Sequence, residues 1–186
     1  MAARIAALAE PYPPELQATF DRVMPKGVPP LVLFTTLARD PRLWAKFRDG
    51  SLLDRGHLTL RQREIVIART AALCRSEYEW GVHAAGFAAK AGLGEAELAS
   101  TVHGNAEDAC WSDADRPLIR ACDALHASCD LDDATWTALR SVLAEEAVLE
   151  FLLVAGFYRT VSYLTNALCL PLESYAPRFP RMRAND

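Results

Sequence analysis

Apolar residues recur every three or four positions along most of this chain, the spacing of one face of an α-helix. No segment alternates apolar and polar residues for long enough to predict a β-strand. The pattern therefore predicts an all-α domain of seven to nine helices. The expected helices span residues 14–24, 31–38, 41–53, 60–74, 76–91, 95–102, 113–128, 133–143 and 145–170.

Local signals mark several of the helix ends. Thr59 and Gln62 have the spacing of a capping box, which predicts a helix start directly after Thr59. Gly92 is the expected left-handed stop of the 76–91 helix. Residues 103–112 have no periodicity and contain Gly, Asn and an acidic run, which predicts a loop.

The chain is predicted to form one domain over residues 1–186, with its core at about residues 30–173. Residues 1–13 are interpreted as an arm on the surface or on a neighbouring subunit. Residues 174–186 are interpreted as a tail that is loosely held or used for subunit contact. The late apolar stretch from Ala147 to Pro171 contains ionisable residues, so we interpret it as a buried helix and not as a membrane span.

Composition narrows the possible partners and compartments. The chain is 51% hydrophobic and 24% charged, with a net charge of −4, which gives no basic surface for nucleic acid. Its five cysteines lack CxxC or CxxH spacing, so neither a disulfide scaffold nor a metal site is expected, and a reducing cytoplasm fits best. The N-terminal apolar stretch is too short for a signal peptide.

Ionisable residues interrupt the apolar pattern in the middle of the chain. Ser76, Glu79, Trp80 and His83 fall at i, i+3, i+4 and i+7, which places them on one helical face. Glu64 lies on the preceding predicted helix among core-type residues. Two carboxylates and an imidazole that converge in apolar surroundings can perform acid–base chemistry. The alternative is structural: a buried histidine bonded to a carbonyl, or a surface Glu79–His83 pair.

Two stretches carry a resemblance to a known family. Residues 63–83 read REIVIARTAALCRSEYEWGVH, residues 84–98 read AAGFAAKAGLGEAEL, and together they resemble the carboxymuconolactone decarboxylase family, which includes the alkylhydroperoxidase D proteins. Residues 151–173, FLLVAGFYRTVSYLTNALCLPLE, look like the second half of longer members. The likeness covers roughly residues 30–173. It implies an all-helical fold, homotrimers or homohexamers, and an active site beside the motif helix.

The chain departs from the peroxidase branch of that family. That branch looks like Glu-x(11)-Cys-x-x-Cys-x-x-x-His, and Glu64 and His83 fall on its Glu and His, but its two cysteine positions are Ser76 and Glu79. A dithiol peroxidase needs one thiolate to attack the peroxide and a second thiol to resolve the sulfenic acid. Cys74 lies two residues before the first cysteine position, so only a one-cysteine mechanism is conceivable. A Glu four residues before the His resembles the decarboxylase branch.

The resemblance and the clustered residues together suggest roles. His83 is the candidate general base or acid, Glu79 is its partner, and Glu64 orients the imidazole or relays a proton. The candidate substrate-contacting residues are Ser76, Tyr78, Trp80, Tyr158 and Arg159. Aromatic residues at helical spacing equally often pack in a core, which is the alternative for Tyr78 and Trp80.

Arg159 allows two interpretations. A cation within an apolar helix needs a partner, so it pairs with Glu64 or Glu150, or it holds a substrate carboxylate.

Three functions follow as hypotheses. The first is a carboxymuconolactone decarboxylase-like enzyme, working without a cofactor, that moves protons on a small carboxylated, carbonyl or lactone substrate. The second is an alkylhydroperoxidase D-like peroxidase that uses Cys74 or no thiol. The third is a helical oligomer whose pocket only binds a ligand. The sequence does not name the substrate or choose between trimer and hexamer.

Overall fold

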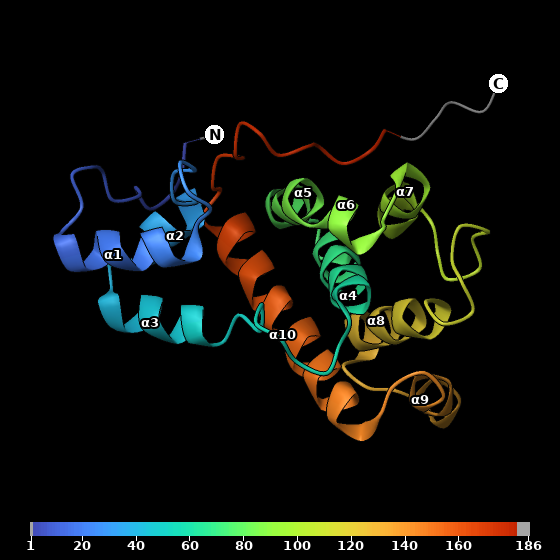
Figure 1. Ribbon diagram of the computed structural model, residues 1–186. Coiled ribbons are helices and arrows are strands. Elements are labelled where there is room, and N and C mark those ends of the chain that lie inside the picture. The colour runs from blue at the N-terminus through green and yellow to red at the C-terminus, as the bar shows by residue number, and fades with distance from the viewer. Residues whose placement is uncertain (1, 182–186) are drawn as a thin grey trace.

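A computed structural model describes residues 2–181, which form helices and loops without any β-strand (Figure 1). The ten helices in this range are α1 (Pro14–Val23), α2 (Val32–Leu37), α3 (Pro41–Asp49), α4 (Leu60–Leu73), α5 (Glu77–Gly86), α6 (Ala88–Ala91), α7 (Glu95–His103), α8 (Arg116–Ser128), α9 (Asp133–Arg140) and α10 (Glu145–Ala167). The all-α prediction is confirmed. One helix more than expected occurs because Phe87, with φ −130° and ψ −25°, interrupts the predicted 76–91 helix.

The predicted helix-end signals at Thr59 and Gly92 act as expected, whereas one helix predicted from apolar spacing alone ends early. The Thr59 hydroxyl accepts the Gln62 N–H, and the Gln62 side chain accepts the Thr59 N–H, so the capping box starts α4. Gly92 ends α6 with a left-handed φ of 67°. The helix predicted over 41–53 ends earlier, and Leu52 adopts a φ of 51° that no α-helix continues.

The centre of the molecule is α4. Its nine consecutive residues from Arg63 to Ala71 are buried, and α5, α7, α8 and α10 pack around it. A helix covered on all sides must pair any polar residue it carries. Arg69 meets this need with Asp123, at 2.6 Å between Nε and Oδ1, and with the Thr101 carbonyl, at 2.9 Å. Glu64 meets it within the candidate site.

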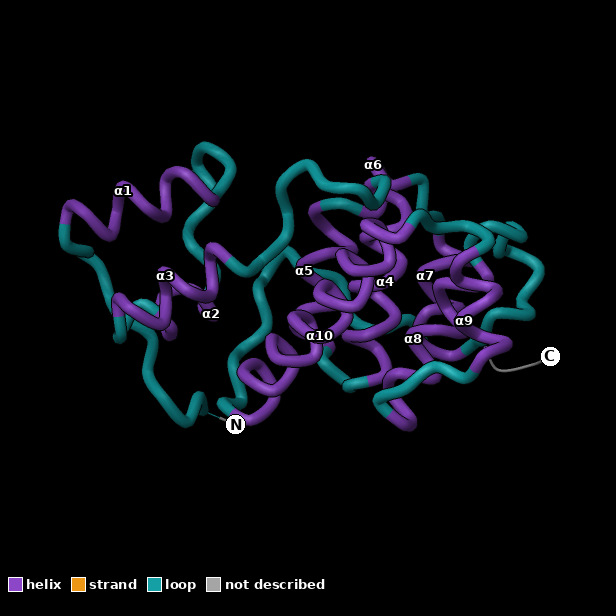
Figure 2. The backbone as a smooth tube through the Cα atoms, turned by 90° about the horizontal axis from the view of Figure 1, so that it is seen from below, coloured by secondary structure: helices purple, strands orange, loops and turns teal. Residues whose placement is uncertain are grey.

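The helices α1, α2 and α3 lie together beside the main bundle, as Figure 2 shows. A smaller aromatic cluster holds these three helices together. Phe20 and Trp44 lie at its centre, with ring centroids 5.5 Å apart, and Phe34 packs against Trp44 at 5.0 Å. Phe47 contacts Phe157 of α10 at 5.1 Å and so connects this N-terminal lobe to the bundle. A cavity lies at the boundary between this lobe and the bundle.

The last helix, α10, is long and apolar enough by length and composition to cross a membrane. Nine of its residues are nevertheless buried against α4, α5 and α9, as expected of a core helix, which passes the same test. Its opposite face exposes Leu149, Leu153 and Tyr163. The packing therefore supports the interpretation of a buried helix.

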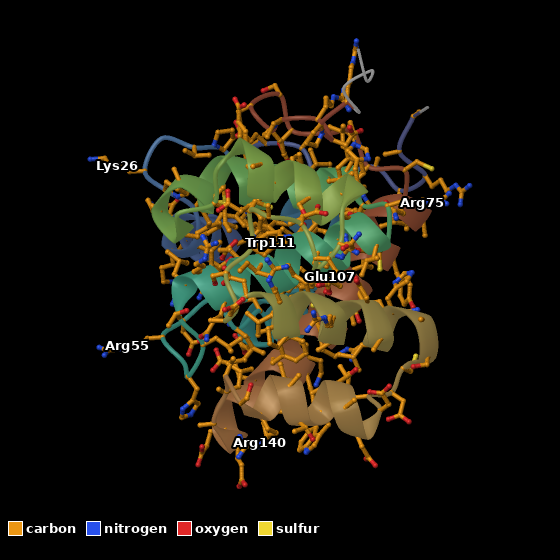
Figure 3. All side chains as sticks on the ribbon, turned by 90° about the vertical axis from the view of Figure 1, so that its right-hand side faces the viewer. Lys26, Arg55, Arg75, Glu107, Trp111 and Arg140 are labelled. Atoms are coloured by element: carbon orange, nitrogen blue, oxygen red, sulfur yellow. The ribbon has the colours of Figure 1, made fainter. Side chains whose placement is uncertain are left out.

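The predicted loop over residues 103–112 is anchored at its end. Trp111 is buried, and its Nε1–H donates to the Ser100 hydroxyl at 2.7 Å. In Figure 3 Trp111 lies near the centre of the view, whereas Lys26 and Arg55 extend outward at its edge.

The N-terminal arm lies on the chain's own surface. The Arg4 N–H donates to the Leu168 carbonyl at 2.8 Å, and the Leu8 N–H donates to the Thr35 carbonyl at 3.1 Å.

The expectation that the C-terminal tail is loosely held is wrong for residues 174–181. This segment crosses α5 and α7 (Figure 1), the Phe179 N–H donates to Glu77 at 2.9 Å, and the Phe179 ring packs on Trp80 at 5.4 Å. An aromatic anchor and a backbone hydrogen bond fix the segment in place. Residues 182–186 of the predicted tail lie outside the described part of the chain.

Candidate active site

A tight turn between α4 and α5 brings the polar residues of the site together. Arg75 adopts a left-handed φ of 55° and turns the chain back, so that α5 packs along α4. Ser76 then caps α5 by accepting the Glu79 N–H at 3.4 Å. Glu64 and His83 are 19 residues apart in sequence and face each other across the two helices.

The facing side chains form a continuous buried chain of charged groups. Nδ1 of His83 lies 2.7 Å from Oε2 of Glu64, and Nε2 of the same ring lies 3.3 Å from Oε1 of Glu79. Behind Glu64, the Arg63 Nε–H donates to its other oxygen at 3.2 Å. All four residues are at most 9% exposed. Each partner limits the movement of the next, so the group is positioned before any ligand binds.

The two carboxylates determine the protonation state of the imidazole. Burial alone would lower the pKa of His83, but the hydrogen bonds to Glu64 and Glu79 and their negative charges outweigh it and raise that pKa to about 9. The ring is therefore an imidazolium at neutral pH and donates from both nitrogens. With Arg63 and His83 positive and two carboxylates negative, the buried group has no net charge.

A cavity of about 550 Å³ lies between the N-terminal lobe and the α5–α10 pair. This volume falls within the roughly 300–1,000 Å³ of small-molecule sites. Its walls are mainly aliphatic and aromatic, and His83, Glu79 and Tyr158 are the polar groups deep in its lining. Oε2 of Glu79 is buried and has no hydrogen-bond partner among the described residues. Such an oxygen is costly to bury unless a ligand or water supplies a donor.

The third wall of the cavity comes from the C-terminal segment, which contributes Tyr175. Glu173 fixes this wall, because its Oε1 accepts the Val32 N–H at 2.7 Å and also the Tyr78 hydroxyl. The Tyr78 hydroxyl in turn accepts the Leu33 N–H at 3.1 Å. One carboxylate therefore ties the start of α2, the motif helix α5 and the C-terminal segment together.

Comparison with known proteins adds the family. The sequence profile of the carboxymuconolactone decarboxylase family matches residues 41–118. This segment belongs to that family. It includes Glu64, Glu79 and His83, whereas the cavity walls at residues 23–34 and at Tyr175 lie outside it. No curated protein matches the chain in sequence.

Solved structures share the fold over almost the whole chain. A peroxidase-related protein from Silicibacter sp. TM1040 is 18% identical with a TM-score of 0.77, covering 94% of this chain and 96% of its own. An alkylhydroperoxidase AhpD core protein from Ralstonia eutropha JMP134 is 20% identical with a TM-score of 0.77, covering 93% and 95%. A variant of the debrominase Bmp8 in complex with 2,3,4-tribromopyrrole is 14% identical with a TM-score of 0.76, covering 94% of each chain. At these identities the likeness establishes the fold alone.

Four predicted site residues of this carboxymuconolactone decarboxylase segment and of α10 come together. Glu79, His83 and Tyr158 line the cavity, and Glu64 reaches it through His83. The Tyr158 ring packs edge-on against the imidazole, with centroids 5.0 Å apart. Burial and the charges of Glu79 and Glu64 raise the pKa of Tyr158 well above its usual range, so its hydroxyl keeps its proton.

Three residues predicted to contact substrate lie outside the cavity lining. Trp80 packs against Ala68 and Ala71 and donates its Nε1–H to Thr101. Ser76 bonds the Thr165 hydroxyl at 2.8 Å, and Tyr78 belongs to the Glu173 contacts described above. Consecutive helical residues point about 100° apart. The side of α5 that carries Ser76 to His83 is therefore wide enough for some side chains to line the cavity and others to pack against neighbouring segments.

Arg159 corrects another prediction. It reaches neither Glu64 nor Glu150, and it lies outside the main cavity. Its Nε–H donates to the Tyr163 hydroxyl at 2.9 Å, and its Nη1 caps carbonyls at the end of α8. Glu150 instead accepts backbone N–H groups of the α3–α4 loop, including that of Leu58 at 3.1 Å. Arg159 is therefore a structural residue that secures the end of α8 to α10.

Cys74 also lies away from the cavity. Its Sγ is 4.0 Å from Nδ1 of His126. Burial raises the pKa of the Cys74 thiol more than nearby Arg159 lowers it, so the thiolate is disfavoured. These surroundings are the reverse of those that activate a peroxidatic cysteine.

Several groups that complete the site were not predicted from the sequence. Arg63 anchors Glu64, Phe87 stacks on the imidazole with centroids 5.1 Å apart, and Lys90 lies at the cavity mouth. Residues 23–34 and Tyr175 supply the outer walls. Two of these residues could have been found from their spacing. Arg63 directly precedes Glu64, and Phe87 lies four residues after His83, one helical turn further along.

Among residues 2–181, no group of three or more His, Cys, Asp or Glu side chains is arranged to hold a metal ion. Both ring nitrogens of His83, the best ligand in the cavity, already bond to carboxylates.

Proposed function

We propose that this protein is an enzyme that transfers protons on a small carbonyl substrate, with Glu79 as the group that touches the substrate. The unpartnered Oε2 of Glu79, buried in the lining of a cavity large enough for a small molecule, is the observation that supports this most strongly. A general base must lie within hydrogen-bond reach of the proton it removes. His83 cannot be that base, because both of its nitrogens are engaged by carboxylates.

In this proposal Glu79 Oε2 takes a proton from the carbon beside the substrate carbonyl. The electron pair of that C–H bond moves into the carbonyl and gives an enolate. The hydroxyl of Tyr158, which keeps its proton, donates a hydrogen bond to the enolate oxygen. Return of the proton from Glu79 to another carbon completes an isomerisation. A β-keto acid bound in its neutral form would instead give its carboxyl proton to Glu79, lose CO2 to leave the same enolate, and take that proton back from Glu79 on carbon.

His83 and Glu64 act through Glu79 in this scheme. The imidazolium bonds to Oε1 and holds the carboxylate, which leaves Oε2, on a residue that lines the cavity, without a partner in the described part of the chain. Glu64, fixed by Arg63, keeps the ring in place from the other side. They are positioning residues, which revises the expectation that His83 itself is the base or acid.

The peroxidase alternative has less support from the geometry. Cys74 lies outside the cavity with a raised thiol pKa, and Ser76 and Glu79 occupy the two cysteine positions of the peroxidase motif. Loss of an organic hydroperoxide on incubation with the reduced protein would favour it.

We further propose that the protein is a homo-oligomer of a reducing cytoplasm. Leu149 and Leu153, one turn apart on α10, and Trp136 on α9 are exposed apolar side chains that a homotrimer or homohexamer could bury. All five cysteines are free thiols, which is consistent with the expected reducing cytoplasm.

The test is exchange of substrate protons with solvent. A panel of β-keto acids, enol acids and lactones is mixed with the protein in deuterium oxide, and the loss of C–H signals beside the carbonyl is followed by NMR. We expect enzyme-dependent exchange with at least one compound, reduced about 10²–10⁴-fold by Glu79→Gln. Glu146→Gln, on the exposed first turn of α10, is the matched control and should exchange at the wild-type rate. Exchange that survives Glu79→Gln would refute the assignment of Glu79.

A further inference from the structure

At the deep end of the cavity, one oxygen of Glu79 lacks a hydrogen-bond partner in the part of the chain that the structure describes. Oε1 of Glu79 is paired with His83, but Oε2 is buried without a partner. A carboxylate oxygen only accepts hydrogen bonds, so the group that satisfies it must donate an O–H or N–H. A ligand without such a donor would leave the oxygen desolvated and unpaired, which costs affinity.

The charges around this oxygen decide what else the ligand carries there. Arg63, Glu64, His83 and Glu79 together have no net charge when the imidazole is protonated. A carboxylate placed beside Oε2 would meet a like charge in a buried, apolar setting, and no free imidazole nitrogen would be available to pair with it. The deep end therefore favours a neutral donor and disfavours an anion.

The remaining walls of the cavity favour a ligand whose main part is apolar. Phe34, Phe47, Phe87 and Phe157 line the cavity together with aliphatic residues of the N-terminal lobe. Within residues 2–181, the lining contains one lysine, Lys90, which is exposed on α6, and no arginine. Aromatic and aliphatic surface of this kind gains free energy by covering a ring system.

We propose that the cavity takes a neutral, ring-bearing molecule whose single hydroxyl or N–H group, of the phenol, enol or azole kind, donates to Glu79 Oε2. This names the substrate class and rests on the proposed function in so far as Glu79 is the residue that touches the substrate. For an enol, the donated O–H proton is the one that Glu79 passes to carbon, so binding and tautomerisation use the same oxygen. Molecules whose buried end is a carboxylate are rejected.

The test uses three probes of nearly equal size on the wild-type protein. These are 2-naphthol, 2-methoxynaphthalene and 2-naphthoate, with dissociation constants measured by calorimetry near neutral pH. We expect 2-naphthol to bind roughly 10–100-fold more tightly than its methyl ether, the value of one hydrogen bond to a charged acceptor. The naphthoate should bind more weakly than both. Equal affinities, a preference for the naphthoate, or no binding by any probe up to its solubility would overturn the proposal.

A variant ties the preference to Glu79. Glu79→Leu removes the acceptor at similar volume, so the ether should now bind at least as well as the naphthol. A preference for naphthol that persists in this variant would place the donor elsewhere and would refute the assignment. The result is separable from the proton-transfer test. Naphthol selectivity without any deuterium exchange would support the ligand class and refute the proposed enzymatic activity. Deuterium exchange together with tight binding of the naphthoate would support the activity and refute the ligand class.

Discussion

The stability of this protein should depend on pH in a window set by one residue, His83. Its pKa is 6.5 in the unfolded chain and about 9 in the folded protein, where Glu64 and Glu79 hold the proton. Between these values the folded state binds one more proton than the unfolded state. Raising the pH therefore favours unfolding, and the contribution of His83 is complete below pH 6.5 and lost as the pH rises to about 9.

The size of the effect follows from the shift. One pKa unit corresponds to about 1.4 kcal/mol, so the free energy of unfolding should fall by about 3 kcal/mol across the window. A loss of this size is a large fraction of the roughly 5–15 kcal/mol that stabilises a typical protein. The assay is denaturant unfolding under reducing conditions at several pH values between 6.5 and 9. Cysteine thiols titrate at about pH 8.5 in an unfolded chain and add to the slope above about pH 8, so the contribution of His83 is read from the lower part of the window.

Two variants isolate the cause. His83→Gln cannot hold the proton, so its stability should be nearly independent of pH in this window. His126→Gln is the matched control, because burial and Arg159 lower the pKa of His126, which is the opposite direction to the shift of His83. It should keep the wild-type slope. A wild-type stability that stays constant between pH 6.5 and 9 would refute the claim that the two carboxylates hold an imidazolium.

Three further predictions follow. Glu173→Gln should lower the free energy of unfolding by about 1–3 kcal/mol in a denaturant titration, because the Val32 N–H and Tyr78 hydroxyl lose a charged acceptor; an unchanged midpoint would contradict this role. Gly81→Ala should lower the melting temperature and expose the C-terminal segment to proteolysis, since the new Cβ would lie 2.5 Å from the Pro177 carbonyl oxygen; wild-type proteolysis would show that the segment is not docked there. Cys74→Ser should leave deuterium exchange at the wild-type rate, and a large loss would return the thiol to the mechanism.

The pairing of Glu64 with His83 could be predicted from the sequence because it depends on local rules. The capping signals and apolar spacing define two helices with a short break, and such helices pack side by side. Residues on their facing sides then meet. The same reasoning could not separate Glu79 from Trp80, since both lie on the apolar side of α5. Which of the two faces a cavity depends on what packs against each edge of that side.

Long-range contacts explain the remaining errors. Arg159 was expected near Glu150, but nine residues along a helix place two side chains on opposite faces, and the neighbours of α10 differ on each. The cavity walls at residues 23–34 and at Tyr175 come from docking of the N-terminal lobe and the C-terminal segment. Apolar spacing predicts the helices of the lobe but not the surface on which the lobe docks, and the C-terminal segment has no periodic pattern.

The most direct test of the account is the protonation state of the His83 ring, read by nitrogen-15 NMR. His83→Gln assigns its two resonances among those of the four histidines. We predict that both nitrogens carry a proton at neutral pH and that the ring titrates near pH 9. A neutral ring at neutral pH, with one unprotonated nitrogen, would contradict the arrangement in which His83 holds Glu79 and leaves one carboxylate oxygen for the substrate.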